Sequence, residues 1–181
     1  STESAFDIQY AFIKRPTYKN TSWDHARFEV AGQRYADISD HSYGAALIND
    51  SKYGHAVKEN MIDLALLRST SDPDHSADIG SHLIRYAYLP HKGTLVESDV
   101  MACAAMLNRP AGVFGGFESD ADSMFCHIAE SDGVTLEVLK KGEKEDCRII
   151  RLVECNGKIS KAVLEFAGKI SAAETNLIEW E

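Results

Sequence analysis

Short runs in which apolar and polar residues alternate recur along the whole chain, and residues that favour turns separate them. Alternation with a period of two places successive side chains on opposite faces of a strand, so each run predicts a β-strand. In the first half of the chain, the predicted strands are residues 5–13, 26–30, 33–38, 45–49, 61–68 and 82–89. In the second half, they are residues 124–129, 134–140, 147–154, 162–166 and 173–178. The even spacing of the second set is typical of an antiparallel β-sandwich.

The turn residues predict how these strands connect. Residues 31–32 (Ala-Gly), 131–133 (Ser-Asp-Gly) and 156–157 (Asn-Gly) are typical of hairpin turns. Residues 50–54 (Asp-Ser-Lys-Tyr-Gly) form another predicted turn, and residues 143–146 (Glu-Lys-Glu-Asp) a charged hairpin tip. Antiparallel neighbours joined by short turns are therefore expected in both halves.

Helical character is confined to residues 96–107, which are rich in Ala, Met and Leu and contain no Gly or Pro. A strand remains an alternative for this segment. Residues 110–116 (Pro-Ala-Gly-Val-Phe-Gly-Gly) resemble a linker, and acidic residues continue it over 118–122. We therefore predict an all-β protein of antiparallel β-sandwich units with at most one short helix. One β-sandwich portion spans residues 1–112 and a smaller one spans residues 113–181.

The net charge of the chain bears on which partners it can bind. The chain has 19 basic and 28 acidic residues and a net charge of -9. Nucleic acids and anionic membranes both require a basic surface, so we expect neither as a partner. A neutral sugar is indifferent to this charge. No apolar run approaches the roughly 20 residues that span a bilayer.

Motifs of self-sufficient catalysis are missing from the sequence. It contains no phosphate-binding glycine loop, no Gly-x-Ser-x-Gly elbow and no His-Glu-x-x-His pair. Potential metal ligands are densest in the polar segment 69–80 and just after it, at Asp72, Asp74, His75, Asp78 and His82. The Ser-Asp-Pro-Asp composition there favours a solvated loop over a metal site.

Several ordered motifs resemble the family 38 α-mannosidases, in particular their bacterial and cytosolic branch. In the first half they are residues 6–10, 15–17, 20–24, 26–30, 36–39, 43–54, 66–69, 73–74, 77–80 and 86–91. In the second half they are residues 136–141, 151–154 and 174–179, which resemble the terminal β module of the family. The resemblance implies a piece of the C-terminal β region, truncated at both ends, with a supersandwich-like part followed by a smaller sandwich.

The resemblance also implies a function. Family members are retaining exo-α-mannosidases that use a carboxylate nucleophile and a bound zinc, both held mainly by an N-terminal α/β domain. We therefore expect no catalytic residue, metal ligand or cofactor in this chain, with the zinc in the missing catalytic domain. The expected partners are that catalytic domain and mannose-containing oligosaccharides, in a cytoplasmic enzyme. Self-association is a further expectation, since a separated domain exposes apolar surface.

The best candidates for contact with sugar lie in the turn after residue 48 and on the strand that follows it. They are Asn49, Asp50, Lys52, Tyr53 and Arg68. Loops of this kind supply polar groups that orient a sugar, whereas the alternative is that Asn-Asp and Tyr-Gly only build a tight turn.

Two other functions stay open from the sequence. The first is a stand-alone carbohydrate-binding module with aromatic platforms at Trp23, Tyr35, Tyr43 or Tyr53. The second is an independent hydrolase that uses the carboxylates and histidines between Asp72 and His82.

Overall fold

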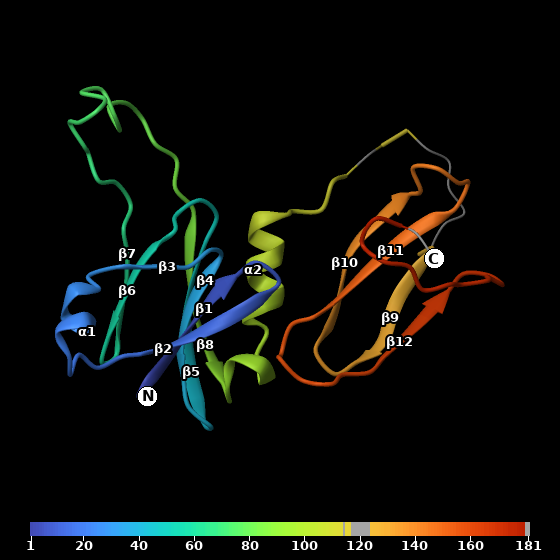
Figure 1. The fold of residues 1–181 in the computed structure, drawn as a ribbon, viewed down its shortest axis with the longest axis horizontal. Helices are drawn as coiled ribbons and strands as arrows, with labels where there is room; N and C mark the ends of the chain where they lie inside the picture. Colours follow the sequence, from blue (N-terminus) through green and yellow to red (C-terminus); the bar gives the residue numbers. More distant parts are fainter. Residues whose placement is uncertain (114, 117–123, 180–181) are drawn as a thin grey trace. The chain divides into compact units, whose positions relative to one another are not determined.

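The computed structural model describes residues 1–113, 115–116 and 124–179, and it divides into two compact units (Figure 1). Unit 1 is Ser1–Gly112 and unit 2 is Val113–Glu181. Antiparallel strands dominate both units, so the predicted all-β class is confirmed. The acidic stretch expected to continue the linker, residues 118–122, lies outside the described residues.

The chain opens with a hairpin rather than with one long strand. β1 (Glu3–Ile8) pairs with β2 (Ala11–Pro16), and Ile8 faces Ala11 across the turn. Tyr10 adopts a φ of 59°, in the left-handed region, and its ring is exposed. The predicted single strand over 5–13 is therefore wrong. The sequence does not reveal the turn, because residues 9 and 10 (Gln-Tyr) are not among the residue types that favour turns.

A five-stranded sheet forms the centre of unit 1, in the order β2-β1-β4-β5-β8. β4 is Tyr35–Ser39, β5 is Tyr43–Asn49 and β8 is Tyr86–Lys92. The carboxylate of Asp40 closes the β4–β5 turn, where its Oδ1 accepts from the backbone N–H of Ser42 at 2.8 Å and of Tyr43 at 3.0 Å. These bonds, the one from Ser42 first, lower the pKa of Asp40 to about 2.

A three-stranded sheet, β3-β6-β7, packs on one face of the five-stranded sheet. β3 is Val30–Ala31, β6 is Gly54–Lys58 and β7 is Met61–Leu64. β3 pairs with β6, whereas β4 belongs to the other sheet, so the predicted hairpin at residues 31–32 is wrong and that segment crosses between sheets. β6 was not predicted, because its short sequence Gly-His-Ala-Val-Lys alternates weakly.

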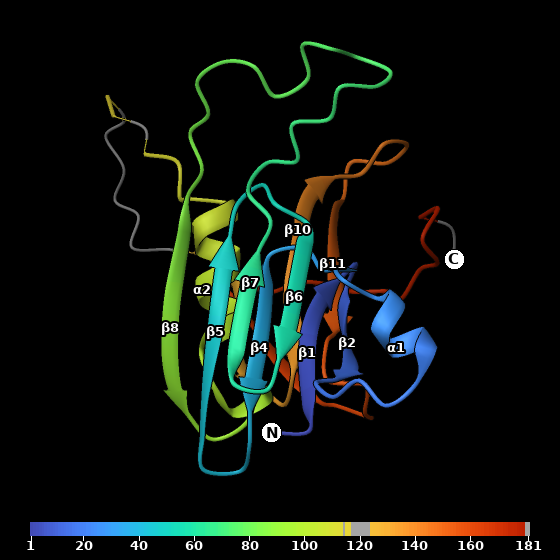
Figure 2. The same cartoon turned by 90° about the vertical axis from the view of Figure 1, so that its left-hand side faces the viewer.

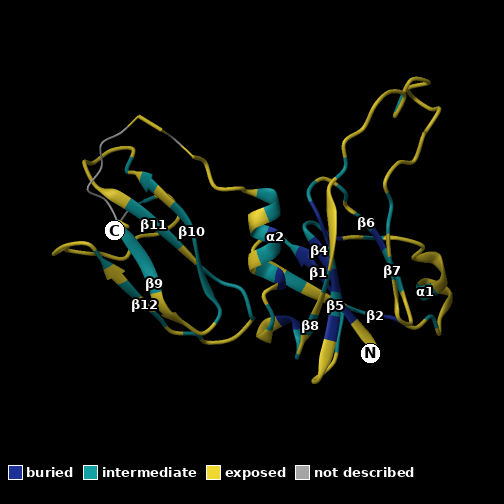
Figure 3. Ribbon diagram, turned by 180° about the vertical axis from the view of Figure 1, so that it is seen from behind, coloured by how far each residue is buried: buried dark blue, intermediate teal, exposed yellow. Residues whose placement is uncertain are grey.

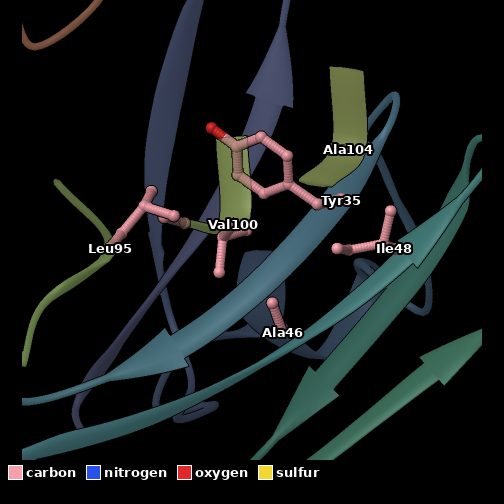
Figure 4. Close-up of a cluster of buried hydrophobic side chains, with 7 residues drawn as sticks. Tyr35, Ala46, Ile48, Leu95, Val100 and Ala104 are labelled. Atoms are coloured by element: carbon pink, nitrogen blue, oxygen red, sulfur yellow. The ribbon is translucent and has the colours of Figure 1, made fainter. Parts of the chain in front are cut away.

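Helix α2 (Val100–Asn108) covers the opposite face of the five-stranded sheet, which confirms helical structure for most of residues 96–107. A 3-10 turn, η1 (Leu95–Glu97), precedes it. The core between helix and sheet consists of small and medium side chains around one aromatic ring (Figure 4): Ala5, Tyr35, Ala46, Ile48, Leu95, Val100 and Ala104. The additional helix α1 (Ser22–Ala26) is a single turn, capped by reciprocal bonds between Thr21 and Asp24.

Unit 2 consists of two two-stranded ribbons. β10 (Val134–Lys141) and β11 (Arg148–Glu154) form a hairpin whose tip is the predicted charged segment 143–146. β9 (Cys126–Ser131) pairs instead with β12 (Ala162–Phe166). The bounds of β12 are the same as those of the predicted strand, residues 162–166. The turns at 131–133 and 156–157 therefore cross between ribbons, and their assignment as hairpins is wrong.

The last predicted strand, residues 173–178, is also wrong, because this segment has no strand structure and ends in a turn. Unit 2 has a thin core. All fully buried side chains among the described residues belong to unit 1, whereas the strands of unit 2 are half-buried or exposed (Figure 3). Phe125 and Phe166 form an edge-to-face pair in this unit, with ring centroids 5.9 Å apart.

The packing of α2 generates a prediction about stability. Leu95 is 4% exposed, and truncation to alanine removes buried apolar contacts and leaves a cavity. We expect Leu95→Ala to lower the free energy of unfolding by about 3 kcal/mol in urea titrations. The neighbouring Val96 is 46% exposed and serves as the matched control. Val96→Ala should change the free energy of unfolding by less than about 0.5 kcal/mol. Equal losses in the two variants would contradict the assigned core.

Candidate functional site

The turn of residues 49–54 leaves β5 and enters β6 beside a long irregular loop, residues 65–85, here called the arm. The arm extends beyond the ends of the strands (Figures 1 and 2). Backbone bonds join the turn to both ends of the arm: Ala65 donates to the carbonyl of Gly54 at 2.9 Å, and Asp50 donates to the carbonyl of Arg85 at 3.2 Å. The turn and the base of the arm, the turn–arm junction, therefore form one local structure.

Asn49 lies behind the junction and is 1% exposed. Its Nδ2 donates to the carbonyl of Gln33 at 3.0 Å, while its Oδ1 accepts from the backbone N–H of Lys52 at 2.7 Å and of Ser51 at 3.1 Å. Its own carbonyl accepts from Asn108 Nδ2 at 2.9 Å. These bonds give Asn49 a structural role, which is the alternative that the sequence left open.

His55 lies next to Asn49 and is fully buried, which is unusual for a side chain that can carry a charge. Its Nε2 lies 3.3 Å from Asn49 Nδ2, so this ring nitrogen acts as the acceptor. A Cβ atom at Gly32 would lie 3.0 Å from His55 Nδ1, so glycine leaves room for the ring. Burial lowers the pKa of His55, which is therefore neutral at physiological pH.

Asp50 ties the turn to the end of the arm. Its Oδ2 accepts from Arg85 Nε at 2.7 Å, and its Oδ1 accepts from the backbone N–H of Arg85 at 3.3 Å. The Arg85 side chain is the largest cause that lowers the pKa of Asp50. The carboxylate is thus ionised and engaged within the protein.

Arg68 lies at the other end of the arm and forms an ion pair with Glu29. The pair passes over Gly54, where a Cβ atom would come within 2.6 Å of Glu29 Oε2. The backbone of Arg68 and Ser69 is fixed by Asp78, whose Oδ2 accepts from their N–H groups at 3.2 and 2.8 Å. These bonds lower the pKa of Asp78. The guanidinium of Arg68 remains exposed to solvent, with 67% of its side chain accessible.

Three predicted side chains thus present polar groups at the surface of the junction. Tyr53 is 63% exposed, Lys52 is half-buried, and Arg68 is exposed beside Glu29. A phenol, an ammonium and a guanidinium can orient sugar hydroxyls by hydrogen bonds.

The sequence did not indicate the residues that hold these groups in place. Glu29, Asp78 and Arg85 are distant from the turn along the chain, and only the fold brings them to the junction. The Gly54 position gives the one local signal, since a glycine after Tyr53 allows the close approach of Glu29.

The potential metal ligands of the arm do not gather. Asp74 accepts from Ser76, Asp78 binds the backbone at Arg68 and Ser69, and His82 Nε2 lies 3.0 Å from the carbonyl of Asp78. Over the residues that the structure describes, no group of three or more His, Cys, Asp or Glu side chains could hold a metal ion. The described arm therefore gives no geometric support for an independent metallohydrolase.

The predicted aromatic platforms differ in exposure. Tyr35 is 1% exposed and belongs to the core under α2, so its assignment as a platform is wrong. Trp23 at 77%, Tyr43 at 55% and Tyr53 at 63% are exposed.

Comparison with known proteins assigns the family. Residues 1–76 match the glycosyl hydrolases family 38 C-terminal domain, and residues 133–181 match the glycosyl hydrolases family 38 C-terminal beta sandwich domain. Human alpha-mannosidase 2C1 is 39% identical over 161 residues, which are 87% of this chain and 16% of the human protein. Alpha-mannosidase G of Dictyostelium discoideum is 37% identical over 84% of this chain and 14% of its own length. The chain therefore belongs to glycosyl hydrolase family 38 and corresponds to the C-terminal region of that family.

Solved structures agree on the fold. The crystal structure of an alpha-mannosidase from Enterococcus faecalis V583 covers 99% of this chain and 22% of its own chain, with a TM-score of 0.80 at 15% identity. A glycosyl hydrolase family 38 protein from Enterococcus faecalis gives a TM-score of 0.76. The chain thus spans less than a quarter of the length of these matched proteins. No helix among the described residues is long and apolar enough to cross a membrane.

The bonds of Asn49 generate a second prediction. Asn49→Ala leaves two backbone N–H groups and one carbonyl without their partner, so we expect the free energy of unfolding to fall by about 3 kcal/mol. Asn20 is exposed and makes a matched control, because Asn20→Ala should change this free energy by less than about 0.5 kcal/mol. Chemical denaturation of both variants measures the difference. An Asn49→Ala variant as stable as the parent would refute the structural role.

The environment of His55 generates a third prediction. Because its pKa is lower in the folded chain than the value of about 6.5 in the unfolded chain, the unfolded state binds a proton more readily. Stability is therefore complete above about pH 6.5 and decreases as the pH falls from there towards the folded pKa. His55→Gln should reduce the change in unfolding free energy between about pH 7 and about pH 5.5, whereas His75→Gln, at an exposed position, should leave it unaltered. Identical pH slopes in parent and His55→Gln would argue against a neutral buried ring.

Proposed function

We propose that residues 1–181 act as the non-catalytic C-terminal part of a retaining exo-α-mannosidase that releases terminal mannose from oligosaccharides in the cytoplasm. The observation that carries the proposal is the order of two family 38 C-terminal domain matches along one chain. Relatives named alpha-mannosidases align with most of the chain, which supports the same activity for the longer polypeptide. The nucleophile and a zinc ion would belong to a catalytic domain outside these residues.

The turn–arm junction is the part of unit 1 that we assign to the active-site cleft. Lys52, Tyr53 and Arg68 present hydrogen-bonding groups at one surface, while Glu29 and Asp78 hold the backbone and guanidinium around them. In this role, the C-terminal region packs against the catalytic domain and closes the cleft. Binding energy from such peripheral contacts lowers the activation barrier only when the contacts strengthen in the transition state.

The test uses the longer polypeptide with a nitrophenyl α-mannoside and an α-linked mannobiose as substrates. We expect Arg68→Ala, Lys52→Met and Tyr53→Phe each to reduce kcat/KM, with the first reduced about tenfold, equivalent to about 1.4 kcal/mol. Lys58→Met, at the opposite end of β6, is the matched control for Lys52→Met and should retain parental kinetics.

The ion pair requires its own control. Glu29→Gln removes the partner charge and leaves the Arg68 guanidinium in the protein. A loss of kcat/KM in Arg68→Ala that exceeds the loss in Glu29→Gln supports contact with sugar, whereas equal losses indicate a structural pair. Parental kinetics in all three junction variants would contradict the assigned cleft contact. Release of mannose by residues 1–181 alone would contradict the non-catalytic role.

A stand-alone carbohydrate-binding module is the second candidate, and the exposed rings of Trp23, Tyr43 and Tyr53 favour it. Calorimetric titration of residues 1–181 with mannobiose tests this candidate directly. Saturable binding that is lost in a Tyr43→Ala or Tyr53→Ala variant would support it over the accessory role.

A further inference from the structure

The five-stranded sheet of unit 1 is covered unequally on the face opposite α2. The three-stranded sheet covers Phe6 of β1 and Ala36 of β4, which are both fully buried. In Figure 2, β6 and β7 lie in front of this part of the sheet, and no described strand lies in front of β8. The remaining half of that face is therefore open to solvent.

The open half presents mainly uncharged side chains from β5 and β8, with the exposed Lys92 opposite Tyr43 at one end. Leu47 faces Tyr88 and Asn49 faces Tyr86 in the β5–β8 pairing, which places Tyr43, Ala45 and Leu47 on the same face as the two tyrosines. Tyr43, Tyr86 and Tyr88 are 55%, 60% and 67% exposed. We call this surface the open strip: Tyr43, Ala45, Leu47, Tyr86 and Tyr88.

A cavity of about 340 Å³ lies between the open strip and β7. Its lining includes Ile38, Tyr43, Leu47, Asn60, Ile62 and Tyr88, all within unit 1. Ile62 belongs to β7, so the cavity continues directly from the edge of the three-stranded sheet onto the strip.

β7 is the last described strand of its sheet and pairs with β6 on one side only. The bond from the Ala65 N–H to the Gly54 carbonyl fixes which backbone groups point to β6. Because these groups alternate along an antiparallel strand, the N–H and C=O groups of Ile62 and Leu64 point to the other side, towards the open strip. Residues 61–64 contain no Lys or Pro and the β6–β7 register has no bulge, so neither a lysine, a proline nor a bulge blocks pairing at the edge of β7, a strand of four residues with one charged side chain, Asp63.

We propose that an extended segment of the longer polypeptide, from outside residues 1–181, pairs with β7 as a further strand and covers the open strip. The unpaired edge supplies the hydrogen bonds that an extended segment requires, and the uncharged strip suits apolar side chains at every second position. The longer polypeptide of the proposed function would supply such a segment, since the residues aligned with human alpha-mannosidase 2C1 are 16% of that protein. The inference rests on one part of the proposed function, that residues 1–181 act within a longer enzyme, and it is independent of sugar contact at the junction.

A sugar is a weaker fit to the cavity. The Asp40 carboxylate at its rim already accepts from Ser42 and Tyr43, and the Ser39 hydroxyl donates to Asp37 at 2.6 Å. Sugar recognition needs several polar groups directed at hydroxyls, and two of those at this rim, Asp40 Oδ1 and the Ser39 hydroxyl, are already bonded within the protein.

The test compares hydrogen–deuterium exchange in residues 1–181 and in the longer polypeptide, with residue-resolved mass spectrometry. We expect the amides of Ile62 and Leu64 to exchange rapidly in the shorter chain and at least roughly a hundredfold more slowly in the longer one. The amides of Met61 and Asp63, which point to β6, serve as internal references within the same strand.

A pair of tyrosine variants locates the contact. Tyr88→Lys places a charge on the open strip, whereas Tyr18→Lys places one at an exposed position, 51% accessible, away from it. In the longer polypeptide, only Tyr88→Lys should restore rapid exchange at Ile62 and Leu64. Circular dichroism of both variants in the shorter chain verifies that each still folds.

Each alternative occupant gives a distinct result that overturns the proposal. Equally rapid exchange of Ile62 and Leu64 in both lengths shows that no strand pairs with β7. Protection that appears in the shorter chain with rising concentration, together with dimerisation in sedimentation analysis, identifies a second copy. Protection that requires added mannobiose identifies a sugar. Loss of kcat/KM in the junction variants is a separate measurement, so failure of either proposal can be recognised without the other.

Discussion

The side chain of Asn49 connects every layer of unit 1. It ends β5 in the five-stranded sheet, contacts His55 of β6 in the three-stranded sheet, and bonds the carbonyl of Gln33 in the segment that crosses between them. The backbone carbonyl of the same residue accepts from Asn108 Nδ2 at the end of α2. A buried amide contributes both donors and acceptors, so one residue satisfies groups from four elements that would otherwise be buried without partners. The conformation of the turn, and with it the surface of the junction, depends on these bonds.

The local pattern of the sequence predicts elements whose pairing is also local. β5, β10, β11 and β12 lie close to their predicted positions, and the charged tip at 143–146 closes a genuine hairpin. The errors occur where the chain leaves its sheet. Gly32, Gly133 and Gly157 stand in segments that look like hairpin turns in sequence, yet each connects strands of different sheets. A turn signal reports that the chain reverses, and the partner of each strand is decided by burial at long range.

The candidate site shows the same division. Its central turn is visible in the sequence as a cluster of Asn, Asp, Tyr and Gly, and Arg68 follows on the next predicted strand. The groups that orient the cluster come from elsewhere: Glu29 before β3, Asp78 in the arm and Arg85 at its end. Sequence reasoning also could not separate buried Asn49 from exposed Tyr53, since polar and aromatic residues are both common in turns. Only the tertiary contacts distinguish residues that build the junction from those that face outward.

The nesting of strands in unit 2 has a consequence for how that unit assembles. β10 and β11 are adjacent in sequence, whereas β9 and β12 flank them and meet only when the intervening chain has been folded back. Since closing a short loop costs less entropy than closing a long one, we expect the inner hairpin to form before the outer ribbon. A nascent chain therefore cannot complete the outer ribbon until β12 has emerged from the ribosome, and until then β9 presents an unpaired edge to its surroundings.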